Sequence, residues 1–201
     1  MRAKIKKRTT WIFLALTLLV IVVLALLGPA EQALGSNVRM VYLHGAWVWT
    51  ALTAYLAAAL AGLAGLLLRK QGMHCWSLAL GRTGLLFWLT YLPLSLLAMQ
   101  TNWNGLFLAE PRWRLALIFA VVGLLLQAGL TLLARPAWAS VGNVAFAAAL
   151  VVALRNTSSV MHPDNPIFSS DALSIQFYFL LLVVMVLLAA LQVAYAQVNK
   201  C

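Results

Sequence analysis

The sequence predicts an all-α, membrane-embedded bundle of about six transmembrane helices, with both termini on the same side. Three observations support this fold class. Of 201 residues, 64% are hydrophobic and only 9% are charged, whereas a soluble domain carries about 25% charged residues. The apolar residues form long runs, and a helix needs about 20 of them to cross a bilayer. The cations also gather in alternate connecting segments. We therefore expect residues 1–201 to form a single membrane-embedded domain.

Six segments are long and apolar enough to span a bilayer, or nearly so: 11–28, 41–68, 83–99, 115–134, 137–154 and 173–196. The first follows a basic patch, but it lacks a small-x-small cleavage pattern, which favours an uncleaved helix over a signal peptide. The second is longer than the bilayer core requires at about 1.5 Å of rise per residue. Its outer end is therefore expected to project into the membrane interface or to tilt.

The charges predict the orientation, because cytoplasmic connections of membrane proteins are enriched in Lys and Arg. An N-terminus inside the cell places ten of the fourteen cations in the cytoplasm: Arg2, Lys4, Lys6, Lys7, Arg8, Arg69, Lys70, Arg82, Arg135 and Lys200. The outer side keeps the other four cations and all four acids: Arg39, Arg112, Arg114, Arg155, Glu31, Glu110, Asp164 and Asp171. This pattern predicts a multi-pass protein of the cell inner (plasma) membrane, N-in and C-in. Cations retained on the cytoplasmic side thus account for the net charge of +10. Membrane lipid rather than nucleic acid is therefore the expected partner.

Several classes of chemistry have no support in the sequence. The two cysteines, Cys75 and Cys201, both fall on the predicted cytoplasmic side, where disulfides are rare, so no bond between them is expected. Cys-x-x-Cys and haem-attachment motifs are absent, as are phosphate loops, nucleophile elbows and zinc-binding His-Glu-x-x-His patterns. The chain is therefore not expected to be an enzyme. The spans contain no acid, which argues against a proton-coupled transporter.

The outer connections hold the histidines of interest. His44 lies at the outer end of the second span, and His162 lies in the last outer loop, so both should reach the same face. Imidazole is a common ligand of haem iron, and two imidazoles on one face could hold an iron from both sides. Position alone favours the other interpretation, two interfacial histidines with water or carbonyl partners. His74, between Lys70 and Arg82, is expected to be solvated.

Aromatic residues gather near the same outer interface: Tyr42, Trp47, Trp49, Trp103, Phe107 and Trp113. Belts of this kind ordinarily anchor a protein at the membrane surface. The same rings could also hold a flat porphyrin, with its propionates paired to nearby arginines such as Arg39 and Arg112. Both interpretations remain open from the residues alone.

The segment 35–47 reads Gly-Ser-Asn-Val-Arg-Met-Val-Tyr-Leu-His-Gly-Ala-Trp. It resembles the entry to the second helix of the CcmC-like haem-handling membrane proteins of the cytochrome c assembly (CcmC/CcmF/CcsA) family. Arg39, Tyr42 and His44 match that family's pattern at equal spacing, and a tryptophan follows at Trp47. The order of later features is also similar, and the resemblance covers roughly residues 35–190.

The resemblance implies haem b at the outer membrane face, with His44 and His162 as iron ligands. A tryptophan-rich outer segment would form its platform, to which Trp103, Glu110 and Arg112 correspond. This segment is eroded here, since Leu106, Phe107 and Ala109 stand where the family has tryptophans, and Thr157 and Ser158 replace a tryptophan pair. The family also implies partners, namely an extracytoplasmic haem chaperone and membrane subunits of the ATP-binding-cassette type.

Two hypotheses about function follow. In the first, the chain binds haem at the outer face and delivers it during cytochrome c biogenesis. In the second, it is a divergent structural or assembly subunit of a larger membrane complex that has lost haem transfer, which would fit the missing tryptophans. An unrelated small permease or channel is a third alternative.

Overall fold

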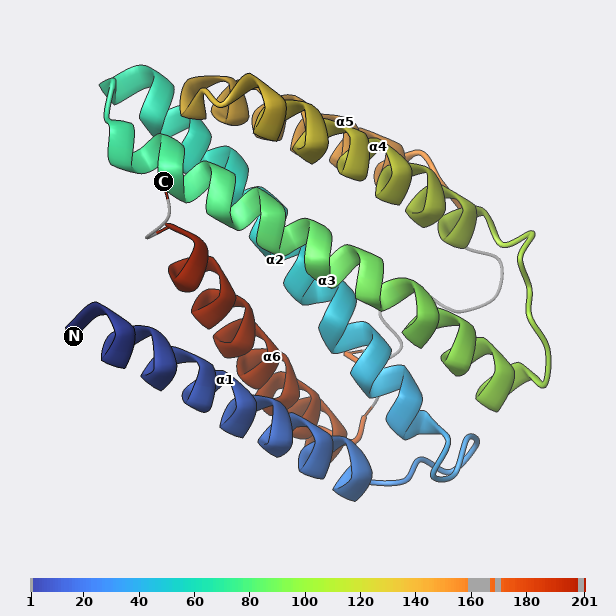
Figure 1. Cartoon of the computed structure of the whole chain (residues 1–201). Helices are drawn as coiled ribbons and strands as arrows, with labels where there is room; N and C mark the ends of the chain where they lie inside the picture. Colours follow the sequence, from blue (N-terminus) through green and yellow to red (C-terminus); the bar gives the residue numbers. More distant parts are fainter. Residues whose placement is uncertain (1, 159–166, 169–170, 199–200) are drawn as a thin grey trace.

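A computed structural model describes residues 2–158, 167–168, 171–198 and 201 (Figure 1). These residues form six helices: α1 (Arg2–Leu27), α2 (Val38–Leu68), α3 (Gln71–Trp103), α4 (Pro111–Leu133), α5 (Pro136–Arg155) and α6 (Leu173–Val198). The described part of the chain has no β-strand. Each of its six helices is long and apolar enough to cross a membrane. The predicted all-α bundle of six membrane-spanning helices is thus confirmed.

The largest difference from the predicted spans is in α3, which begins at Gln71 instead of residue 83. The connection to α2 shrinks to Arg69 and Lys70, because Arg69 takes a left-handed conformation (φ 53°) and Lys70 an extended one. Polar residues in the first turns of α3 lower the hydropathy there. Some of them are nevertheless buried, and the Ser77 hydroxyl donates a hydrogen bond to the Ala58 carbonyl at 2.8 Å.

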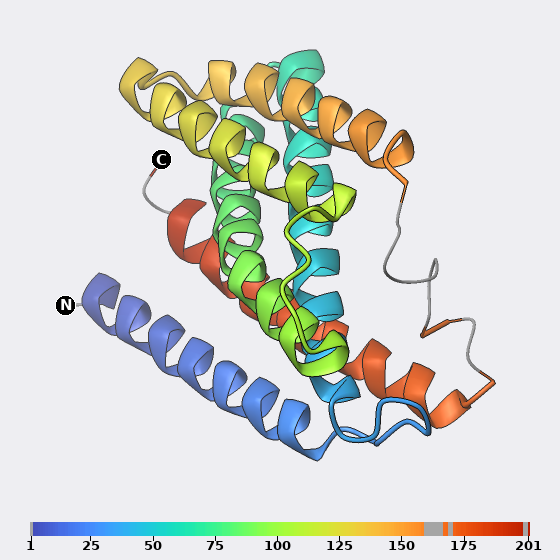
Figure 2. The same cartoon turned by 90° about the vertical axis from the view of Figure 1, so that its right-hand side faces the viewer.

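The two long helices α2 and α3 pack against each other at the centre of the bundle. Figure 1 shows α4 and α5 together on one side of this pair and α1 with α6 on the other. The rotated view in Figure 2 shows the same grouping. Both termini lie at one end of the bundle with the turns at 69–70 and 134–135, and we call this the basic end. The connections 28–37 and 104–110 lie at the opposite end, the loop end.

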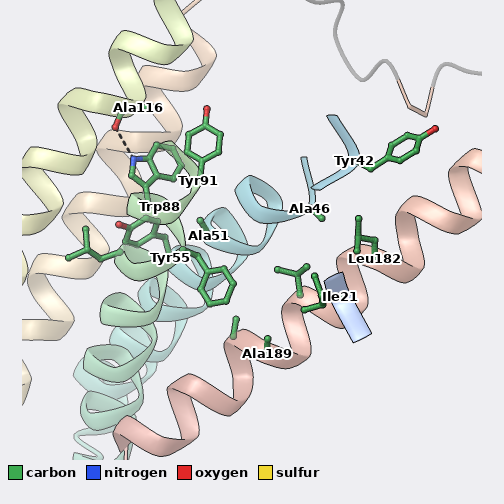
Figure 3. Packing of buried hydrophobic residues seen from close by; sticks show 14 of the residues in the cluster. Ile21, Tyr42, Ala46, Ala51, Tyr55, Trp88, Tyr91, Ala116, Leu182 and Ala189 are labelled. Carbon is green, nitrogen blue, oxygen red and sulfur yellow. Dashed lines mark hydrogen bonds between the residues drawn. The ribbon is translucent and has the colours of Figure 1, made fainter. Parts of the chain in front are cut away.

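The core between the helices is built from aromatic rings and small residues (Figure 3). Trp88 is 1% exposed, and its indole N–H donates a hydrogen bond to the Ala116 carbonyl at 2.9 Å. The Tyr55 ring packs on Trp88 and on Phe146, at centroid distances of 6.1 Å and 4.8 Å. This satisfied hydrogen bond and the ring contacts join α2, α3, α4 and α5, and they give the loop end a rigid base.

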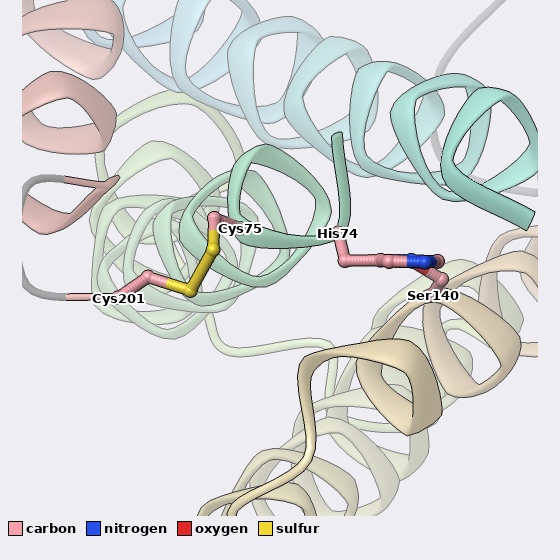
Figure 4. Close-up of a disulfide and its surroundings, with 4 residues drawn as sticks. All are labelled: His74, Cys75, Ser140 and Cys201. Carbon is pink, nitrogen blue, oxygen red and sulfur yellow. A yellow bond between two sulfur atoms is a disulfide. The ribbon is translucent and has the colours of Figure 1, made fainter. Parts of the chain in front are cut away.

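Close packing at the basic end depends on small residues, as is usual between helices in lipid. A Cβ on Gly65 would lie 2.7 Å from the His74 Nδ1 atom, so the imidazole packs directly on the α2 backbone. His74 is only 8% exposed, and its Nδ1 lies 2.7 Å from the Ser140 hydroxyl of α5 (Figure 4). The prediction of a solvated His74 is therefore wrong. Its charged neighbours in the sequence suggested a loop, whereas the chain here is already helical.

The expectation that Cys75 and Cys201 stay unbonded is also wrong. Their sulfurs form a disulfide across Cα atoms 5.7 Å apart, which joins the first turns of α3 to the end of the chain (Figure 4). The expectation rested on the redox compartment and ignored geometry. Six spans bring the last residue back to the end of the bundle where α3 begins.

Candidate functional site

A cavity of about 230 Å³ opens at the loop end among α2, α3, the start of α4, residues 167–168 and α6. Four residues that the sequence predicted as haem-binding line it: His44, Trp103, Glu110 and Arg112. They come from three separate parts of the chain. The helix packing therefore brings together side chains that are far apart in the sequence.

Helix α2 presents one face to this cavity. Its lining residues Val41, His44, Gly45, Val48 and Trp49 recur at the three- and four-residue spacing of a helix face. The His44 imidazole lies against the Tyr91 ring of α3, with ring centroids 5.0 Å apart and planes tilted by 35°. The histidine is thus held at the wall of the cavity by the central α2–α3 pair.

Helix α3 contributes the facing wall through Tyr91, Ser95, Ala98, Met99 and Asn102. Sequence reasoning missed Tyr91 and Asn102. A signal was available, because these five positions also follow helical periodicity and lead to Trp103, which had been singled out. Tyr91 lies inside an apolar span, however, and the sequence does not show which face of that helix it occupies.

Glu110 is a buried acidic residue at the start of α4, and its surroundings bear on what the cavity can bind. It precedes Pro111, which favours an extended backbone (ψ 123°) and places Glu110 at the N-cap position of α4. Its side chain is 6% exposed and lines the cavity. The positive end of the α4 dipole favours a carboxylate here. Even so, neither carboxylate oxygen has a hydrogen-bond partner among the described residues.

Two further polar atoms that line the cavity are also buried and unpaired among the described residues. The Trp113 indole nitrogen and the Asn102 Oδ1 atom are buried without a hydrogen-bond partner in the described part of the chain. Buried polar groups in proteins are nearly always hydrogen-bonded, and an unmatched carboxylate is especially costly. A donor and several acceptors left unmatched around one cavity indicate an occupant with polar groups of its own.

The other predicted site residues lie elsewhere. The Arg39 Nε donates a hydrogen bond to the Gly28 carbonyl at 2.9 Å and so fixes the end of α1 to α2. Tyr42 is 1% exposed and packs on Tyr178 in the core. The Trp47 indole N–H donates to the Thr90 hydroxyl at 2.8 Å, away from the cavity. His162 lies outside the described residues.

No model of a known protein family matches the chain, and no curated protein matches it in sequence. The interpretation of the cavity therefore rests on its own residues and on the resemblance of residues 35–47.

Proposed function

We propose that this multi-pass membrane protein binds haem in the loop-end cavity, with His44 as a ligand of the iron. The observation that carries the proposal is the convergence of His44, Trp103, Glu110 and Arg112 on one cavity. Each of them is also a candidate haem-binding residue by its place in the sequence.

The chemical types of the lining residues suit the iron, the ring and the propionates of a haem. A neutral imidazole suits iron, the indole rings of Trp103 and Trp113 suit the macrocycle, and the Arg112 guanidinium suits a propionate. The volume of about 230 Å³ is smaller than the roughly 300–1,000 Å³ of pockets that enclose a whole ligand. The cavity therefore matches one edge of the macrocycle, with the remainder at its mouth. His162 stays the predicted second ligand.

Haem bound here would supply an iron that takes axial ligands. The protein's own part is to hold the haem and release it, with no bond made or broken in a substrate. We infer that the loop end faces the extracytoplasmic side, because nine of the thirteen cations among the described residues belong to segments at the opposite end of the bundle. An extracytoplasmic haem chaperone and transporter-type membrane subunits are the partners that the family resemblance suggests.

Haem content after purification tests this function. A pyridine-haemochrome assay on the wild-type membrane protein should detect haem, and His44→Ala or His162→Ala should reduce it. The matched control is His74→Asn, which removes an imidazole but keeps a hydrogen-bonding side chain beside Ser140. Wild-type protein without haem, from cells that synthesise it, would favour the alternative of a structural or assembly subunit.

A further inference from the structure

Two adjoining cavities occupy the basic end, away from the proposed haem site. The first, of about 190 Å³, is lined by Arg82 of α3, by Arg135 in the α4–α5 turn, and by both disulfide-bonded cysteines. The second, of about 490 Å³, is an apolar groove among α1, α3 and α6 that runs from the basic end along the bundle as far as Trp47 of α2 and Thr90. Arg82 and Gln197 line both, so the two cavities meet along these side chains.

The first cavity is strongly cationic. One Arg82 Nη donates a hydrogen bond to the Thr131 hydroxyl at 3.0 Å, which fixes the guanidinium at the cavity wall. Its other N–H groups have no hydrogen-bond acceptor among the described residues and can serve a ligand. Arg135 follows Ala134, whose left-handed conformation (φ 49°) reverses the chain between α4 and α5. The sequence has no acid between Glu31 and Glu110, or between Glu110 and Asp164. No carboxylate from those stretches neutralises the two arginines.

The groove, in contrast to the first cavity, is mostly apolar. Its walls carry Trp11, Leu14 and Leu18 from α1, Leu86 from α3 and Val193 from α6. Helix α1 packs on α6 and α2, and the Cα atoms of its described residues stay more than 8 Å from those of α3. The groove is thus the space that separates α1 from α3 within the thickness of the bilayer, where an acyl chain is the available apolar molecule.

We propose that these joined cavities bind one anionic phospholipid. Arg82 and Arg135 hold its phosphate, and an acyl chain lies in the groove between α1 and α3. Arginine pairs phosphate oxygens with two parallel N–H groups, and basic pockets between transmembrane helices are suited to lipid headgroups. A polar, cationic compartment that continues into an apolar one matches both halves of such a lipid. This site does not depend on the haem proposal.

The test uses native mass spectrometry of the full-length, detergent-purified protein with added phosphatidylglycerol. The wild type should retain phosphatidylglycerol in preference to phosphatidylcholine. Arg82→Gln and Arg135→Gln should each weaken that binding about fivefold, since each cation near a membrane surface contributes to anionic lipid attraction. Lys70→Gln is the control, because Lys70 is exposed at the same end but does not line the cavity. Val193→Trp, which fills the groove, should also weaken lipid binding.

Each other outcome contradicts the proposal. Equal retention of phosphatidylcholine would show that the headgroup charge is not recognised. Displacement by inorganic phosphate as effective as by a short-chain phosphatidylglycerol would identify an anion site without a lipid chain. An equal loss in Lys70→Gln would indicate a diffuse surface charge effect. If Arg82→Gln fails to fold by circular dichroism, Arg135→Gln carries the test, because Arg135 is exposed in a turn.

Discussion

Two carboxylates of the loop end differ in how their charges are compensated. Glu31 Oε2 accepts hydrogen bonds from the backbone N–H groups of Ala33 and Leu34, both at 2.9 Å. Glu110 is more deeply buried, and neither of its oxygens has such a partner in the described residues. Evolution of a stable fold alone favours the first arrangement. The second is the arrangement expected if a bound ligand supplies the partner of Glu110.

We expect opposite effects when the two charges are removed. Glu110→Gln should leave the stability of the ligand-free protein unchanged or raise it, because it removes a buried charge without a partner. Glu31→Gln should lower stability by about 1 kcal/mol, since hydrogen bonds to a charged acceptor are stronger than those to a neutral one. Thermal unfolding in detergent measures both. Equal losses in the two variants would mean that Glu110 is satisfied within the fold.

The residues of the cavity were partly predictable from the sequence. His44, Trp103, Glu110 and Arg112 stood out because they lie in or beside the predicted outer connections, where polar side chains interrupt the apolar runs. Asn102 and Tyr91 did not, since their role depends on which face of α3 meets α2. The burial of His74 was missed for a related reason: only the packing of Gly65 against it reveals the contact.

At the scale of helices, hydropathy located all six elements but misplaced the start of α3. The polar residues that lowered the hydropathy there belong to a buried hydrogen-bond network. The Asn143 amide of α5 donates to the Ser77 carbonyl at 2.8 Å and accepts from the Gln127 amide at 2.9 Å. Bonds of this kind join neighbouring helices within a bilayer, so polarity in this sequence did not mark the end of a helix.

Gly81 lies against this network and allows a matched pair of variants. A Cβ at Gly81 would lie 2.5 Å from Asn143 Oδ1, so Gly81→Ala should displace the amide and cost about 1–3 kcal/mol. Gly129, inside α4, has nothing within 4 Å of such a Cβ. Gly129→Ala should therefore be neutral or stabilise the helix by up to about 1 kcal/mol. A tolerated Gly81→Ala, judged by the thermal unfolding midpoint, would show that α3 and α5 are not packed this closely.

At the scale of the whole molecule, the two ends differ in chemistry. The loop end carries the cavity with Glu110 and His44, and the basic end carries the disulfide and two arginine-lined cavities. The distribution of cations favours the cytoplasm for the basic end, whereas disulfides are rare in the cytosol. Charge counting could predict which connections share an end, but the pairing of Cys75 with Cys201 required the packed bundle.

Reporter fusions and cysteine labelling decide the orientation. A reporter after Cys201 should behave as cytoplasmic, and one inserted at Asn165 as external. In intact cells, the Cys75–Cys201 disulfide should block labelling by any maleimide. After a membrane-permeant reductant has opened it, a membrane-permeant maleimide should label both cysteines. An impermeant maleimide should label neither. Labelling by the impermeant reagent only after treatment with a reductant would place the basic end outside.

An absorbance titration with haem measures whether the loop-end cavity binds haem through His44. The purified wild-type protein should give a saturable Soret band shifted from that of free haem. His44→Ala should weaken the affinity by at least about tenfold, a loss of about 1.4 kcal/mol of binding free energy, and should alter the band through the lost ligand. His74→Asn should bind like the wild type. An identical band and affinity in His44→Ala would contradict the account.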